Sequence, residues 1–225
     1  MSQQSHQVFF ELKIGSENVK SICAVISLLA KAGRELIIEI DDRSDYFTTM
    51  RALNDSKSAF VSAEFEDRFF VKAELYYSPI TCKVVSKSLP SIFSNMKNII
   101  GITIRLEINP SFVVFELLMS NHITRTHKFL FQECEAVTAV FDDNSASYFQ
   151  SIPRVFNNLL DHIYRSPEII MNVSNSHITF ASYHHGKFTD KTDRLSTGLC
   201  VNISDFDRFV KKVGDVEVIF SSKEV

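Results

Sequence analysis

The sequence has few of the residues that usually build turns. Among its 225 residues are only six glycines and five prolines, and it has no tryptophan. So few turn residues leave little room for long loops or low-complexity segments. Cysteine is also scarce, and no two of the four thiols form a C-x-x-C pair (Cys23, Cys82, Cys134 and Cys200). This spacing disfavours a zinc site and a disulfide framework, and it favours a reducing compartment, the cytoplasm or the nucleus.

The sequence also lacks a long hydrophobic run. Residues 1–7 are polar and have neither a basic start nor an apolar stretch behind them, so we expect no secretory signal. The densest apolar run, residues 22–30, is interrupted by Ser27 and is too short to cross a bilayer. We therefore expect no membrane partner.

An excess of positive charge is missing as well. The 24 lysines and arginines are outnumbered by 27 aspartates and glutamates, which gives a net charge of −3. Proteins that bind nucleic acid over a whole face usually carry a net positive charge. Any contact with DNA must therefore be local.

Hydrophobic residues make up 45% of the chain, including 20 phenylalanines, which is enough for a substantial core. The clearest helix follows Ser16, because apolar residues recur there every three or four positions up to Lys31 and Gly33. A second pattern has Ser86 or Ser88 as its cap and runs to residue 96, and a third begins at Ser151. Runs rich in Val, Ile, Phe and Tyr predict strands between them, at residues 35–40, 46–52, 58–65, 80–85, 102–108, 112–119, 123–131, 168–173, 176–183, 197–203 and 215–220.

The predicted helix starts recur at nearly regular distances. Ser16 and Ser86 are about 70 residues apart, Ser151 follows about 65 residues later, and residues 221–224 form one more helix start behind a strand. The repeat is one helix with about four strands, which predicts an α+β fold of two domains with two repeats each. We expect domain 1 over residues 1–131, a linker over 132–146, and an incomplete domain 2 over 147–225. The alternative is that cap-like serines recur by chance.

This alternation of helices and hairpin strands resembles the sliding clamps that encircle DNA, the group of proliferating cell nuclear antigen. A more specific match lies in residues 126–142, above all 131–135 and 139–142. It resembles the end of domain 1 and the linker in the "nine" subunits of the checkpoint clamp called 9-1-1. Weaker similarity extends over most of the chain, for example at residues 153–155, 182–184 and 199–200.

The resemblance implies a sliding-clamp fold, with inner helices on curved antiparallel sheets, and a domain 2 truncated before its fourth helix and closing strands. A complete member continues into a disordered, phosphorylated tail. The implied function is that of a nuclear, non-enzymatic subunit of a heterotrimeric DNA-damage checkpoint clamp without a cofactor. Its implied partners are two other clamp subunits, a clamp loader, double-stranded DNA, and repair and checkpoint proteins. Two alternatives remain open: a self-trimerising replication clamp, and a metal-dependent 3'-5' exonuclease on a β-rich scaffold.

In such a ring the helices line the central hole and hold cations toward DNA phosphates, which position the protein without reading sequence. The alternative for each single residue is an ordinary solvated charge. The third helix offers Asn157 and Asn158 where replicative clamps carry arginine, which implies weaker contact there. The candidate DNA-facing residues are Lys20, Lys31, Arg34, Lys87, Lys97, Arg154 and Lys223.

Two further surfaces follow from the resemblance. The linker residues Val137, Val140 and Phe141 are candidates for docking partner peptides with apolar anchors, or they simply tether the linker to the sheet below. The edge strands near residues 123–131 and 189–200 would pair with neighbouring subunits through backbone hydrogen bonds.

For the nuclease alternative, the best carboxylate groups are Asp41 with Asp42 and Asp45, and Asp142 with Asp143. Such acids can hold Mg²⁺. Both groups lie at predicted turns, however, where acids usually cap the backbone in water. His184 and His185 are adjacent on a predicted strand and would point to opposite faces, which disfavours a shared metal. No common nucleotide-binding or hydrolase motif occurs.

Overall fold

The structure is a computed structural model that describes residues 7–108, 111–139, 147–163, 167–183, 197–212 and 214–222. The chain divides into two compact units, Met1–Ala139 and Val140–Val225, here called unit 1 and unit 2. The division falls within the range expected as a linker. Among the described residues, no helix has the length and apolar character that a membrane span requires.

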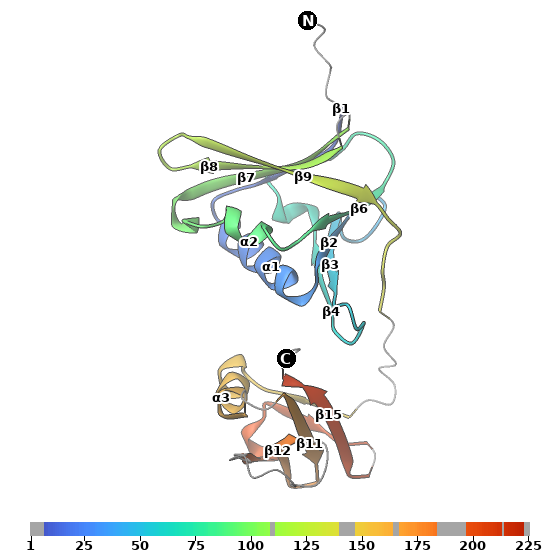
Figure 1. Ribbon diagram of the computed structural model, residues 1–225, viewed down its shortest axis with the longest axis vertical. Coiled ribbons are helices and arrows are strands. Elements are labelled where there is room, and N and C mark those ends of the chain that lie inside the picture. The colour runs from blue at the N-terminus through green and yellow to red at the C-terminus, as the bar shows by residue number, and fades with distance from the viewer. Residues whose placement is uncertain are drawn as a thin grey trace, which may run out of the picture. The chain divides into compact units, whose positions relative to one another are not determined.

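Unit 1 consists of strands and two helices that lie against one face of the sheet (Figure 1). The described strands form one antiparallel sheet in the order β4-β3-β2-β6-β9-β8-β7-β1-β5. The elements of unit 1 are β1 (Gln7–Ile14), α1 (Val19–Ala32), β2 (Glu35–Ile40), β3 (Thr48–Leu53), β4 (Phe60–Phe65), the 3-10 turn η1 (Asp67–Phe69), β5 (Lys72–Leu75), β6 (Ile80–Val85), α2 (Leu89–Ile92), the 3-10 turn η2 (Met96–Asn98), β7 (Ile99–Ile108), β8 (Phe112–Met119) and β9 (Thr124–Glu133).

Two halves of unit 1 are interlocked through their first strands. Strand β1 of the first half pairs with β7 of the second half, with Leu12 opposite Ile104. Strand β6 of the second half pairs in turn with β2 of the first, with Ile38 opposite Cys82. Each half therefore completes the sheet of the other.

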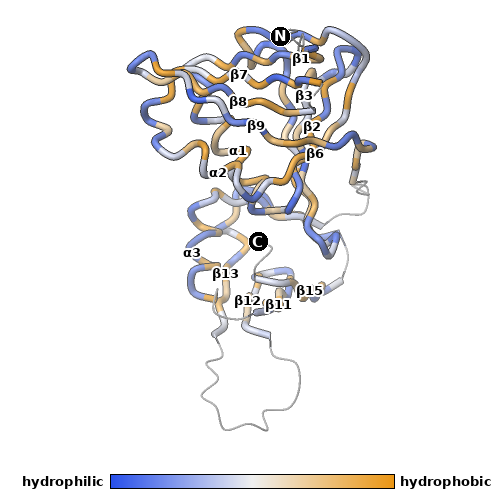
Figure 2. Tube along the Cα trace, turned by 45° about the horizontal axis from the view of Figure 1, so that its top comes forward, coloured by the Kyte–Doolittle hydropathy of each residue, from blue (hydrophilic) through white to orange (hydrophobic). Residues whose placement is uncertain are grey.

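The core of unit 1 lies between the helices and the sheet. Helix α1 buries one stripe, in which Ile22, Ile26 and Leu29 have no exposed surface. The strands contribute every second side chain, such as Leu12 and Ile104, and Figure 2 shows hydrophobic and hydrophilic residues alternating along them. This two-residue period leaves the opposite face of the sheet for charged side chains.

Both helices of unit 1 differ in detail from the expectation. The residue before α1 is Asn18, not Ser16, and its side-chain amide donates a hydrogen bond to the Phe69 carbonyl at 2.8 Å. Helix α2 begins after Ser88 as expected but ends at Ile92. Asn95 adopts a left-handed conformation (φ 68°) there, which asparagine tolerates better than most residues, and a 3-10 turn follows.

Unit 2 repeats the order of elements that opens unit 1. Its described strands form the sheet β13-β12-β11-β15 and the pair β10-β14. The pairs β11-β15 and β10-β14 correspond to β2-β6 and β1-β5. The elements are β10 (Tyr148–Gln150), α3 (Pro153–Ile163), β11 (Glu168–Val173), β12 (His177–Tyr183), β13 (Gly198–Asn202), the 3-10 turn η3 (Ile203–Asp205), β14 (Arg208–Val210) and β15 (Val216–Ser221).

The 3-10 turns make the repeat visible at single residues. Phe70 directly follows turn η1 and Phe206 directly follows turn η3, and both rings are buried in the core of their unit. After each turn, the next amide bonds the first strand of its unit: Val71 N–H to the Lys13 carbonyl, and Asp207 N–H to the Gln150 carbonyl. The first half of unit 1 and unit 2 therefore repeat one another in backbone geometry.

Candidate nucleic-acid interface

The exposed face of α1 carries a lysine near each end. Lys20 and Lys31 are exposed and lie opposite the buried stripe of the helix. They are eleven positions apart, which corresponds to about 16 Å along the axis. Between them are Ala24 and Leu28, and Leu28 is 55% exposed. The exposed face of α1 thus carries a cation near each end, with the apolar side chains of Ala24 and Leu28 between them.

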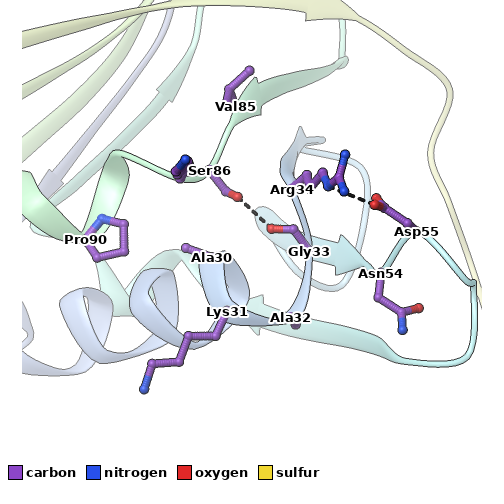
Figure 3. A pocket seen from close by; sticks show the side chains of 11 residues that line it. Ala30, Lys31, Ala32, Gly33, Arg34, Asn54, Asp55, Val85, Ser86 and Pro90 are labelled. Carbon is purple, nitrogen blue, oxygen red and sulfur yellow. Dashed lines mark hydrogen bonds and ion pairs between the residues drawn. The ribbon is translucent and has the colours of Figure 1, made fainter. Parts of the chain in front are cut away.

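Three of the predicted DNA-facing residues meet in one notch of about 760 Å³ at the end of α1 (Figure 3). Lys31 comes from the last turn of α1, Arg34 from the segment before β2, and Lys87 from the segment before α2. The β3-β4 hairpin adds Asn54 and Asp55. The notch therefore brings Lys87 to two cations that lie more than 50 residues before it in the sequence.

Backbone packing fixes the floor of this notch. Ser86 is 1% exposed, its hydroxyl donates to the Gly33 carbonyl at 2.6 Å, and its N–H donates to the Arg34 carbonyl at 2.9 Å. Gly33 also approaches β3 closely, because a Cβ built there would lie 2.5 Å from the Leu53 carbonyl oxygen. The absence of a side chain at Gly33 lets the end of α1 reach the hairpin.

An acid sits at the side of the notch and binds its arginine. Arg34 Nε lies 2.8 Å from Asp55 Oδ2, and the two side chains are 84% and 61% exposed. Figure 3 shows the guanidinium turned to Asp55, whereas Lys31 extends away from the pair. In this arrangement, one of the three cations is already neutralised.

The other predicted cations lie elsewhere. Lys97 belongs to η2, which packs beside α1. Arg154 is exposed in the first turn of α3, whose outer face otherwise carries Asn157, Asn158 and Asp161. Lys223 lies outside the described residues. The structure thus groups three of the seven predicted residues and leaves Lys20, Lys97 and Arg154 outside that group.

Strand β9 has an open side. Residues 124–130 pair with β8, and residues 131–133 pair with β6. In the described part of unit 1, no strand covers the other side of residues 124–130. Two large apolar residues mark this stretch, with Ile123 56% and Leu130 72% exposed. An open strand flanked by apolar side chains is suited to pairing with another chain.

A charged network crosses the outer face beside β9. Glu107, 5% exposed, binds Arg105 Nε at 2.8 Å and Lys128 Nζ at 3.0 Å, and Arg105 also binds Glu116 at 2.6 Å. Burial raises the pKa of Glu107, but the hydrogen bonds from Arg105 and Lys128 outweigh it and lower the pKa below the usual value. The network links β7, β8 and β9 to one another through their side chains.

Only Val137 of the predicted linker site is described, and it is half buried. Val140 and Phe141 lie outside the described residues, as do residues 189–196 of the second predicted edge. The docking of partner peptides at this site therefore stays a prediction.

The acids of the nuclease alternative do not form a metal cluster where they are described. Asp41 accepts hydrogen bonds from the backbone N–H of Arg43 at 2.9 Å and from its Nε at 3.4 Å, as a turn acid does. Asp42 and Asp45 are exposed in the same turn. Among the described residues, no group of three or more His, Cys, Asp or Glu could hold a metal ion. Asp142, Asp143, His184 and His185 lie outside them.

All four cysteines are unpaired thiols. Burial raises the pKa of Cys23 to about 11, and burial together with the nearby Cys134 and Glu133 raises that of Cys82 to about 12. Thiols that stay protonated are weak nucleophiles and weak metal ligands. Cys23 and Cys82 therefore contribute to the core.

Sequence reasoning missed the residues that shape the notch. Asp55 was not singled out, and Gly33 was interpreted only as a helix end. The hairpin composition, an asparagine and an aspartate among serines, marks a turn. The 21-residue separation of Arg34 and Asp55 gives no sign that the two side chains meet.

Comparisons with known proteins agree with one another. The family model described as Rad9 matches residues 22–225. The "Cell cycle checkpoint control protein Rad9" of Drosophila melanogaster is 34% identical over 86 residues, which are 36% of this chain and 18% of the fly protein. The chain thus matches less than a fifth of that relative's length.

Two solved structures have the same fold. Proliferating cellular nuclear antigen from Entamoeba histolytica gives a TM-score of 0.73 at 14% identity, covering 97% of this chain and 82% of that one. The corresponding protein from Thermococcus kodakaraensis gives a TM-score of 0.67 at 13% identity, covering 96% and 83%. The sliding-clamp fold expected from the sequence is confirmed.

Proposed function

The chain belongs to the Rad9 family, and from this membership we propose that it is one subunit of a heterotrimeric checkpoint clamp that encircles DNA. In this proposal, the clamp tethers repair and checkpoint proteins at damaged DNA in the nucleus, after a clamp loader has opened and closed the ring. The observation that carries the proposal is that the family match extends over residues 22–225 of a chain with the sliding-clamp fold.

The charge distribution is compatible with DNA passing through a ring. The net charge of −3 gives no general attraction to DNA, and the exposed face of α1 and the notch supply local cations instead. Contacts with phosphate hold DNA without regard to its sequence, as a sliding tether requires. The same distribution supports a sliding tether.

The open side of β9 supports assembly with other subunits. Backbone groups of residues 124–130 are available for a strand from a neighbour, and Leu130 and Ile123 supply apolar contacts beside them. Antiparallel pairing there would continue the sheet from one subunit into the next. The linker residues Val137, Val140 and Phe141 complete the proposal as a docking site for partner peptides.

Assembly is the direct test. We expect the full-length protein to remain monomeric when purified alone and to form a 1:1:1 ring only with two different clamp subunits, as measured by size-exclusion chromatography with light scattering. Leu130→Asp places a charge beside the seam and is expected to abolish one of the two subunit contacts. Val71→Asp is the matched control, because Val71 is similarly exposed (70%) and lies beside β5. A homogeneous trimer of the chain alone would instead identify a replication clamp.

A further inference from the structure

The notch at the end of α1 has the chemistry of an anion site. Three elements bring Lys31, Arg34 and Lys87 to it, and Asp55 is the acid among its lining residues. Clusters of lysine and arginine bind phosphate groups, and arginine does so through a planar fork. The lining therefore matches one phosphate of a nucleic-acid backbone in charge.

The arginine of the notch is occupied in the absence of DNA. Its Nε donates to Asp55 Oδ2 at 2.8 Å, which takes up one side of the guanidinium fork. Both partners are largely exposed, with 84% and 61% of their side-chain surface accessible. Exposed ion pairs are weak, because water screens them and two long side chains must be ordered. An incoming phosphate can therefore compete with the carboxylate for Arg34.

The acid is positioned by its hairpin and not by the arginine alone. The Asn54 side-chain oxygen accepts hydrogen bonds from the N–H groups of Ser58 and Ala59, both at 2.9 Å. Its amide donates to the hydroxyls of Ser56 and Ser58 at 2.9 and 3.0 Å. These bonds fix the turn that carries Asp55, so the carboxylate is held at the notch in advance.

The internal repeat shows that the arginine is particular to unit 1. Ser86 N–H donates to the Arg34 carbonyl at 2.9 Å, and the corresponding Ser222 N–H donates to the Pro167 carbonyl at 3.1 Å. The strand registers support this correspondence, since Glu35 faces Val85 and Glu168 faces Ser221. Proline thus occupies in unit 2 the position of Arg34, and the Arg34–Asp55 pair is not a general requirement of the fold.

We infer that Asp55 is a built-in competitor of DNA phosphate for Arg34, the arginine of the cation cluster that Lys31 and Lys87 complete. The carboxylate lowers the affinity of this phosphate site, so that DNA contacts there form and break readily. The inference rests on the proposed function, because it takes the bound anion to be the backbone of DNA inside the ring.

The test measures DNA binding by the assembled three-subunit ring as a function of salt concentration. Asp55→Asn keeps the shape of the side chain and removes its charge, so we expect several-fold tighter binding. If Arg34 is released to one more phosphate, the plot of log K against log salt becomes steeper by about 0.9. In the Arg34→Gln background, Asp55→Asn should bring no gain, because the residue it competes for is gone.

Asp42→Asn is the matched control. It removes the same charge from an exposed turn at the far end of β2, about 20 Å along a strand of six residues. Equal tightening by Asp42→Asn and Asp55→Asn would show a general charge effect and overturn the inference. Unchanged or weaker binding with Asp55→Asn would overturn it as well.

Failure of the inference can be told apart from failure of the proposed function. If the unmodified ring binds DNA, and reversing the charges of Lys20, Lys31 and Lys97 together weakens that binding, the clamp proposal holds whatever Asp55 does. If the unmodified ring does not bind DNA, both the clamp proposal and the inference fail.

Discussion

Gly33 is the residue on which the shape of the notch depends most directly. It joins the end of α1 to β2, accepts the hydroxyl hydrogen bond of Ser86, and lies against the backbone of Leu53. A backbone atom of a paired strand cannot turn aside as a flexible side chain does. The close approach of two backbones therefore leaves no room for a methyl group.

Gly33→Ala is expected to destabilise the protein. Its Cβ would lie 2.5 Å from the Leu53 carbonyl oxygen and 3.0 Å from the carbonyl carbon and the amide nitrogen. Shifting α1 away from β3 to relieve this overlap should cost about 1–3 kcal/mol, as overpacking does in other cores. The free energy of unfolding in urea measures the effect. Gly101→Ala is the control, because its Cβ would meet its nearest atom at 3.6 Å, and an equal loss there would refute the steric explanation.

The sequence indicated which residues carry positive charge near helix ends, but it did not indicate which of them lie together. The sequence showed lysines and arginines near helix ends, and the structure brings Lys31, Arg34 and Lys87 to one notch. Their proximity arises because β2 and β6 are antiparallel neighbours in the sheet, so the residues before β2 and after β6 meet at one end of this strand pair. Asp55 joins them through a hairpin, and hairpin tips carry no sequence signal of what they will contact.

At the scale of elements, the 3-10 turns η1 and η3 are equivalent bends in the two units, each lying between two strands. Each interrupts a strand, which then continues on another partner: β4 pairs with β3, and β5 pairs with β1. In unit 2, β13 pairs with β12 and β14 pairs with β10. The phenylalanine after each turn anchors the bend in the core, through ring contacts of Phe70 with Phe65 and of Phe206 with Phe149.

Replacing the anchoring ring in unit 2 tests this role. Phe206→Ala should destabilise unit 2 by about 3–5 kcal/mol, because it leaves a cavity beside Phe149 at the bend. Chemical unfolding, monitored by the exchange of the backbone amides of β10 and β14, measures the loss of unfolding free energy. Val218→Ala on β15 removes a 40% exposed side chain and should change little. Equal effects of the two substitutions would contradict the anchoring role.

Most of the strands longer than four residues were predicted from the sequence, whereas the strands of three or four residues were not. The bounds of β2, β6, β8 and β11 are confirmed to the residue, because each is rich in β-branched, aromatic and other apolar residues. The strands β5, β10 and β14 were missed, since three or four residues are too few for a periodic pattern. Strand β1 was also missed, although its residues alternate between the core and the surface.

At the scale of the whole molecule, the two units differ in the size of their described cores. Unit 1 has a large buried cluster that includes Phe10, Ile26 and Phe115. The cluster of unit 2 is smaller and centres on Ile169, Ile178 and Phe180. Apolar burial is the main favourable term in folding, so the unit with the smaller core has less to offset its loss of chain entropy.

We therefore expect amide hydrogen exchange to differ between the units. In the chain of 225 residues, the amides of β11 and β12 should exchange at least ten times faster than those of β7 and β8, as measured by mass spectrometry at neutral pH. A tenfold difference corresponds to only 1.4 kcal/mol of opening free energy. Equal protection in the two sheets would contradict the link between core size and local stability.

Because β1 pairs with β7, it must remain without this partner strand for some time during protein synthesis. Phe10 and Leu12 of β1 are fully buried in the finished fold, but Leu12 pairs with Ile104, which the ribosome adds about 90 residues later. At about 5–20 residues per second, the apolar side of β1 waits roughly 5 to 20 s for this partner. Strand β5, the other neighbour of β1, is made before β7, but the side of β1 that pairs with β7 stays without its partner strand for the whole interval. The interlocking that later holds the two halves of unit 1 together thus leaves the apolar residues of its first strand exposed while the chain is made.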